Sequence, residues 1–269
     1  MANRKLKTMA QTITNKDINV RPLCPNAVTM TALAFGVSSI NMSLWGKWEY
    51  AMIFIFLSMI FDFLDGKVAR MMGVSSRFGA ELDSLSDFVS FGVAPGVLMY
   101  LWSAKENVCY DVVATRAEVV GVYWIFALFL AMCCATRLAR FNSLLDEKQP
   151  AYWTHFFMGV PAPAGGGLAM FPLILHLATG WDWMRNPTFV GFFLLFSGVM
   201  MASRIPTLSL KHLHIPRTIG AVLLLIGLLF LAGLLVRPWA TLALFGIGYL
   251  ISIPLCVFYF FRFKRRANA

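Results

Sequence analysis

The sequence predicts an all-α membrane protein, a polytopic bundle with about eight transmembrane helices. The first observation is the composition: 59% of the 269 residues are hydrophobic and only 13% are charged, whereas a soluble domain has about 25% charged residues. The second is the recurrence of long apolar segments, which gives a mean hydropathy of +0.70. The third is an uneven distribution of basic residues among the connecting segments. Together these observations exclude an ordinary soluble domain.

The first four apolar segments lie at about 27–44, 48–72, 78–102 and 118–141. Each is close to the length of about 20 residues that a helix needs to cross the hydrocarbon core of a bilayer. The second segment ends with a pair of aspartates, and the third begins with another pair. The fourth ends with two arginines, so charged residues gather near the ends of these predicted helices.

The last four apolar segments lie at about 163–179, 188–202, 217–236 and 238–261. The fifth begins with Gly165–Gly167, which permits close approach by the backbone of a neighbouring helix. The polar pieces between the segments are too short to fold alone. We therefore divide the chain into a cytoplasmic N-terminal segment 1–26, a transmembrane domain 27–262 and a basic tail 263–269.

The basic residues predict the orientation in the membrane. Of the 23 Lys and Arg, all but five fall at the chain ends or at alternate connections; the five are Lys47, Lys105, Arg116, Arg185 and Arg237. Because cytoplasmic segments carry the excess of Lys and Arg, both termini are expected in the cytoplasm. The opposite side carries an aromatic belt: Trp45, Trp48, Trp102, Trp181, Trp183 and Trp239. We expect a protein integral to the cytoplasmic (inner) membrane.

Four aspartates at the junction of the second and third segments mark a functional site. Asp62 and Asp65 are three residues apart and Asp83 and Asp87 are four apart, so each pair shares one helix face. The helices should be joined by a turn near Val74, and an antiparallel hairpin would bring Asp65 to the level of Asp83 and Asp62 to that of Asp87. Carboxylates inside a membrane are costly and usually functional.

Four converging carboxylates require cations between them. Hard divalent ions with oxygen ligands, Mg²⁺ or Mn²⁺, suit this donor set, and two of them would suit four carboxylates. Gly66, Ala69 and Gly79 keep space beside the aspartates. Arg70 and Arg77 add positive charge where a phosphate could bind.

This arrangement resembles the signature of the CDP-alcohol phosphotransferases. All eight fixed positions are present at allowed spacing: Asp62, Asp65, Gly66, Ala69, Arg70, Gly79, Asp83 and Asp87. The resemblance implies a helical, membrane-embedded, commonly homodimeric enzyme whose two-metal site faces the cytoplasm. It implies that the four aspartates ligate the metals, that Asp87 is the general base, and that the other four positions receive the CDP moiety. Ser86 departs from the pattern, because alanine is more usual there.

The flanking segments resemble the phosphatidylserine synthase branch of this family. The resembling pieces are Pro25–Thr29, Ser90–Gly92, Arg137–Asn142, Gly159–Pro163 and Ser203–Lys211. The resemblance implies that Asn26 and Thr29 contribute to nucleotide or phosphate binding. It also implies an acceptor or lipid-phosphate site formed by Arg137, Arg140, Asn142 and Lys211. A guanidinium suits a carboxylate or phosphate, although the same arginines could serve to anchor the protein to anionic lipid headgroups.

The expected reaction is transfer of the phosphatidyl group from CDP-diacylglycerol to L-serine, with release of CMP. Glycerol 3-phosphate, an inositol compound and choline are alternative acceptors with the same chemistry. A cation-coupled transporter is an alternative of a different class, because carboxylates inside membranes also line ion paths. The expected partners are membrane lipids and a second copy of the chain, and nucleic acid is not among them.

Overall fold

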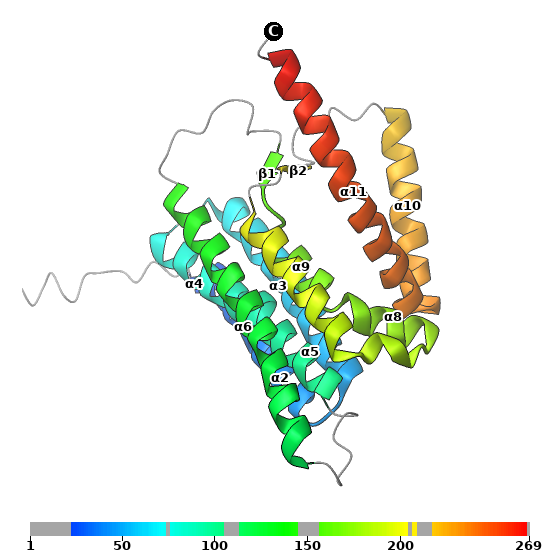
Figure 1. Ribbon diagram of the computed structural model, residues 1–269. Coiled ribbons are helices and arrows are strands. Elements are labelled where there is room, and N and C mark those ends of the chain that lie inside the picture. The colour runs from blue at the N-terminus through cyan, green and yellow to red at the C-terminus, as the bar shows by residue number, and fades with distance from the viewer. Residues whose placement is uncertain are drawn as a thin grey trace, which may run out of the picture.

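The computed structural model describes residues 23–73, 76–104, 113–144, 156–203, 206–208 and 217–267, and these ranges are mainly helical (Figure 1). In chain order the elements are α2 (Leu23–Leu44), α3 (Trp48–Met72), α4 (Arg77–Asp87), η1 (Phe88–Val93), α5 (Ala94–Ala104), α6 (Val113–Leu144), β1 (Phe156–Met158), α7 (Ala162–Ala169), α8 (Phe171–Thr179), η3 (Asp182–Arg185), α9 (Pro187–Ala202), β2 (Pro206–Leu208), α10 (Arg217–Val236) and α11 (Pro238–Ala267). The strands form one short antiparallel pair, with Phe157 opposite Thr207. The predicted all-α class holds apart from this pair.

Helices occupy all eight predicted apolar segments, but the predicted count of eight spans is not confirmed. By length and composition, four described helices can cross a bilayer: Leu23–Leu44, Arg77–Ala104, Gly121–Ser143 and Pro238–Val257. Helices α7 and α8 make a fifth if they are one span bent by 48°. The charged residues of α3 set it apart from an ordinary apolar span, and α9 has only 16 residues. The chain is therefore a helical membrane protein, with four or five candidate spans in the described residues, and the count of eight stays a prediction.

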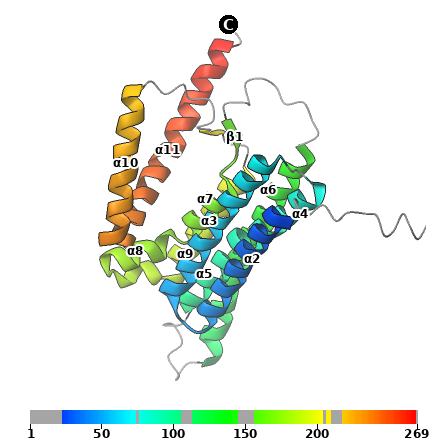
Figure 2. The same ribbon diagram turned by 180° about the vertical axis from the view of Figure 1, so that it is seen from behind.

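Helix α2 packs most extensively against α3 and also contacts α4, η1 and α5 (Figure 2). Its buried face consists of small or short residues at helical spacing, among them Ala32, Gly36 and Ser39. The Ser58 hydroxyl of α3 donates a hydrogen bond to the Ala32 carbonyl at 2.8 Å. Small residues let helices approach closely, which van der Waals packing inside a membrane requires. This packing brings the start of α2 beside the acidic ends of α3 and α4.

The core lies where η1, α5, α6, α7 and α9 meet. Phe91, Leu130 and Leu194 are fully or almost fully buried there. The predicted close approach of the fifth segment is confirmed, since a Cβ on Gly166 would lie 3.3 Å from the backbone of Phe91. Helix α11 packs on α8 and β2, and α10 packs on α11, so these two helices stand together beside the rest of the bundle (Figure 1).

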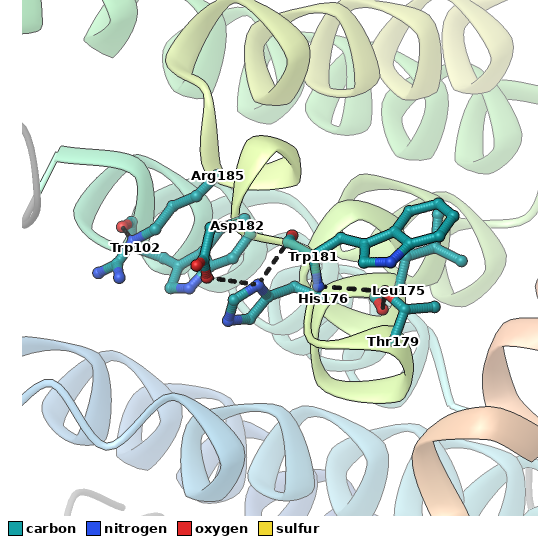
Figure 3. Close-up of polar contacts among 7 residues, drawn as sticks. All are labelled: Trp102, Leu175, His176, Thr179, Trp181, Asp182 and Arg185. Carbon is teal, nitrogen blue, oxygen red and sulfur yellow. Dashed lines mark hydrogen bonds and ion pairs between the residues drawn. The ribbon is translucent and has the colours of Figure 1, made fainter.

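Around Trp102, polar contacts join the end of α5 to α8 and η3 (Figure 3). The indole of Trp102 is 1% exposed. The Arg185 guanidinium lies 5.7 Å from its ring centre and donates a hydrogen bond to its carbonyl at 2.8 Å. The His176 ring lies edge-on to the same indole at 5.4 Å, and its Nδ1 is 3.1 Å from the Trp181 carbonyl oxygen.

We expect Trp102→Ala to lower the free energy of unfolding by about 3–5 kcal/mol, because it leaves a large cavity between three elements. Trp181→Ala is the matched control, since this indole is 57% exposed and the carbonyl that faces His176 is retained. Thermal unfolding in detergent measures both variants. Equal losses of stability in the two would contradict the packing described here.

Candidate metal and substrate site

Helix α3, which carries Asp62 and Asp65, and helix α4, which carries Asp83 and Asp87, are separated by residues with clear capping features. Helix α3 ends at Met72 and is followed by Gly73 in the left-handed conformation, at φ 63°, where glycine has no steric penalty. Helix α4 begins at Arg77, and the Ser76 hydroxyl accepts a hydrogen bond from the Gly79 amide at 2.9 Å, as an N-cap does. The predicted turn therefore lies where expected, although Val74 itself is outside the described residues.

The packing of these two helices differs from the predicted hairpin. Helices α3 and α4 make few direct contacts with each other, and each packs against α2 instead. One carboxylate oxygen from each of Asp62, Asp83 and Asp87 lies within 4.8 Å of the other two. The expected meeting of Asp62 with Asp87 is confirmed, but Asp83 joins them. Asp65 is outside this group of three and is buried, with 5% exposed.

The three-carboxylate group fits a hard divalent cation. Its donors are all oxygen atoms, as Mg²⁺ and Mn²⁺ prefer. Oδ1 of Asp87 and Oδ2 of Asp65 are buried and have no hydrogen-bond partner among the described residues. Buried polar atoms are normally satisfied, so these oxygens are available as ligands. The proximity of three carboxylates is otherwise repulsive, and a cation relieves that repulsion.

A π-helical turn, η1, follows Asp87 directly and carries the buried residues Ser90, Phe91 and Gly92. Such turns interrupt α-helices and are frequent at functional sites. Just before it, the Ser86 hydroxyl donates a hydrogen bond to the Thr29 carbonyl at 3.3 Å. The serine that departs from the family pattern thus links α4 to α2.

A cavity of about 200 Å³ opens beside the carboxylates, between α2, α3 and α4. It is lined by Pro25, Asn26, Thr29, Asp65, Gly66, Ala69, Ser76, Gly79, Ala80 and Asp83. Five of the six residues predicted for nucleotide or phosphate binding are therefore brought together, with two of the aspartates. The sixth, Arg70, is exposed, and its Nε donates a hydrogen bond to the Gly66 carbonyl at 2.9 Å. Pro25, Ser76 and Ala80 were not predicted as site residues, although Ser76 just before a helix was recognisable as an N-cap.

The two glycines of the cavity have different surroundings. A Cβ on Gly79 would lie 3.1 Å from the Ser76 hydroxyl oxygen and 3.2 Å from the Asn26 side-chain oxygen, so a larger residue here would press against both side chains. A Cβ on Gly66 would meet nothing within 4 Å. Gly66 therefore leaves open space in the cavity rather than fitting a neighbouring helix.

Of the four residues predicted for the acceptor or lipid phosphate, Arg137 lies near the carboxylates. Its charge interacts with those of Asp87 and Asp62, and its Nε is buried without a hydrogen-bond partner among the described residues. Arg140 instead donates a hydrogen bond to the Ala202 carbonyl at 2.8 Å. Lys211 lies outside the described residues.

The Asn142 side chain holds α6 against α4. Its amide nitrogen lies 3.0 Å from the Ser84 hydroxyl oxygen and 3.4 Å from a Glu81 carboxylate oxygen. Asn142 thus binds the helix that carries Asp83 and Asp87. Its predicted role toward the acceptor stays a prediction.

The chain is similar to known proteins. Proteins named CDP-diacylglycerol–serine O-phosphatidyltransferase are similar over most of the chain. The one from Mycobacterium leprae is 34% identical over 236 residues, which cover 87% of this chain and 74% of that protein. The one from Helicobacter pylori (strain J99) is 33% identical over 238 residues, 87% of this chain and 90% of that protein. Residues 22–252 match the family model for CDP-alcohol phosphatidyltransferases, and the chain therefore belongs to that family.

Proposed function

We propose that this protein transfers the phosphatidyl group from CDP-diacylglycerol to the hydroxyl of L-serine, giving phosphatidylserine and CMP. The observation that carries the proposal is the group of Asp62, Asp83 and Asp87 beside a cavity lined by residues of the family signature. The choice of serine is supported by the names of the relatives, which are similar over 87–90% of this chain.

Asp62, Asp65, Asp83 and Asp87 would hold two divalent cations, Mg²⁺ or Mn²⁺. When bound, the cations would neutralise charge on the pyrophosphate and on the departing CMP. Asp65 belongs to this set because it lines the same cavity as Asp83 and has a buried oxygen without a hydrogen-bond partner.

The donor is proposed to lie with its CDP moiety in the cavity and its acyl chains in the bilayer. Asn26 and Thr29 would contact the nucleotide or its phosphates from α2, and the small residues Gly66, Ala69 and Gly79 would leave room for it. Arg70 would reach a phosphate by leaving its hydrogen bond to the Gly66 carbonyl. Arg140, Asn142 and Lys211 complete the proposed acceptor or lipid-phosphate site around Arg137.

Asp87 is proposed as the general base. It would take the proton of the serine hydroxyl while the serine oxygen forms a bond to the phosphorus of the phosphatidyl group. The bond from that phosphorus to the oxygen of the CMP phosphate breaks, and CMP leaves with the electron pair. The buried, unpartnered Oδ1 of Asp87 supports this role.

We further propose a homodimer in the inner membrane, with both termini and the active site on the cytoplasmic side. The eighteen basic residues at the chain ends and alternate connections support the orientation. A cytoplasmic site would give the enzyme direct access to soluble serine.

The purified protein is expected to release CMP from CDP-diacylglycerol only when serine and Mg²⁺ or Mn²⁺ are both present. Radiolabelled serine should appear in the lipid fraction in equal amount, because one phosphatidyl group is transferred for each CMP. Glycerol 3-phosphate, inositol and choline serve as comparison acceptors. Release with one of these, and none with serine, would refute the serine assignment and leave the transfer chemistry in place.

A further inference from the structure

Among the side-chain polar atoms that are buried without hydrogen-bond partners in the described part of the chain, three come from α4, α6 and α11. They are Oδ1 of Asp87 on α4, Nε of Arg137 on α6 and the hydroxyl oxygen of Tyr249 on α11. Folded proteins rarely leave such atoms unsatisfied, and the cost is greater in a membrane, where water is scarce. A single unpaired atom can have many causes, but unpaired donors on α6 and α11 together with an unpaired acceptor on α4 indicate a shared ligand.

The three groups lie within electrostatic range of one another through Arg137. The Arg137 guanidinium interacts electrostatically with the carboxylates of Asp87 and Asp62, and the Tyr249 phenol also lies within range of its charge. Arg137 is therefore close enough to the carboxylate group and to Tyr249 for its charge to act on each of them. A ligand bound to Arg137 would therefore be near both the phenol and the carboxylates.

The position of Tyr249 on α11 supports this arrangement. Ile253 and Cys256, four and seven residues later, are 8% and 4% exposed and share its helix face. The opposite face carries Leu244 and Ile251, which are 72% and 57% exposed. Tyr249 thus faces the protein rather than lipid, although its hydroxyl makes no hydrogen bond there.

The chemistry of the three groups defines what would satisfy them. A guanidinium and a phenol hydroxyl are both donors, and together they suit an anionic oxygen group such as a carboxylate. Asp87 is an acceptor and suits a hydroxyl. A small molecule with a carboxylate and a hydroxyl group meets both demands, and serine is such a molecule.

We propose that Arg137 and Tyr249 form the binding site for the carboxylate of the acceptor, with Asp87 facing its hydroxyl. The proposal rests on the proposed function and deepens it, because it makes Tyr249 a residue that determines the choice of acceptor. Tyr249 comes from α11, far in sequence from the aspartate signature. A phosphate of the donor is the other anion that this pair could bind, and the experiment separates the two.

The test is Tyr249→Phe, which removes only the hydroxyl. The KM for serine is expected to rise about tenfold, because the variant loses a hydrogen bond to a charged group. The KM for CDP-diacylglycerol and the midpoint of thermal unfolding should not change. Serine binding, measured by calorimetry on the Mn²⁺-loaded protein without donor, should weaken by the same factor. Serinol, which has a CH₂OH group in place of the carboxylate, should be an equally poor acceptor for wild type and variant.

Tyr123→Phe is the matched control. The Tyr123 hydroxyl pairs with the Thr188 hydroxyl at 3.0 Å, on helices α6 and α9 and outside the cavity. This variant should keep the KM for serine.

An unchanged KM for serine in Tyr249→Phe would overturn the proposed carboxylate site. If the wild type still uses serine in that case, the proposed function stands. A raised KM for CDP-diacylglycerol alone would assign the pair to the donor phosphate and also overturn the carboxylate site. A wild type that uses only acceptors without a carboxylate refutes both proposals.

Discussion

Asp83→Asn is expected to lower the rate of CMP release on the order of 10³-fold, an effect of the size seen when a group that stabilises the transition state is lost. Asparagine keeps the size of the side chain and one oxygen atom but removes a negative charge from the group of three carboxylates. The variant should still fold, because fewer like charges then repel one another. CMP release with saturating serine and donor measures the effect.

A second measurement connects the loss to metal binding. Mn²⁺ should raise the midpoint of thermal unfolding of the wild type, since a ligand that binds the folded state stabilises it. This rise should be smaller in Asp83→Asn. Glu81→Gln is the control on the same helix, because Glu81 is exposed and is not one of the three grouped carboxylates. Full activity in Asp83→Asn would rule out the metal site.

Gly66→Leu is expected to raise the KM for CDP-diacylglycerol about tenfold or more, which corresponds to a loss of at least about 1.4 kcal/mol in binding. The leucine side chain would extend into the cavity that Gly66 lines, where a Cβ meets nothing within 4 Å. The same substitution should stabilise α3 by up to about 1 kcal/mol, because glycine is unfavourable in a helix. Donor binding and stability should therefore change in opposite directions.

Gly227→Leu is the control for this prediction. Gly227 is exposed on α10, and a Cβ there also meets nothing within 4 Å. Kinetics with varied donor, together with thermal unfolding, compare the two variants. An unchanged KM in Gly66→Leu would show that the donor lies elsewhere, and a variant that fails to fold would show that the space is not open.

Much of the site was predictable because its signals are local. The spacing of the aspartate pairs fixes the face of each helix, since a helix repeats every 3.6 residues. Gly73 and Ser76 end one helix and begin the next through backbone conformation and capping, which depend on neighbouring residues alone. The lining of the cavity by Asn26 and Thr29 was expected from family resemblance, and local signals would not have revealed it.

The incorrect expectations concern packing between distant residues. The expectation that the aspartates pair at equal depth on either side of the turn assumes that α3 and α4 lie side by side. Each of these helices packs on α2 instead. As a result, Asp83 joins Asp62 and Asp87, and Asp65 lies outside that group. Arg137 and Arg140 look equivalent in sequence. In the structure only Arg140 is held by the Ala202 carbonyl, whereas Nε of Arg137 remains unpaired near the carboxylates.

The sequence by itself determined the helical membrane class, the approximate ends of the helices and the identity of the acidic residues. These properties follow from the length of the apolar segments, from the distribution of charged residues and from residue spacings within one or two helical turns. Only the tertiary structure decided which carboxylates form a group, how α2 completes the cavity and that Tyr249 lies within electrostatic range of Arg137. Arg137 and Tyr249 are more than a hundred residues apart, and no local preference records their proximity, because it depends on how whole helices pack.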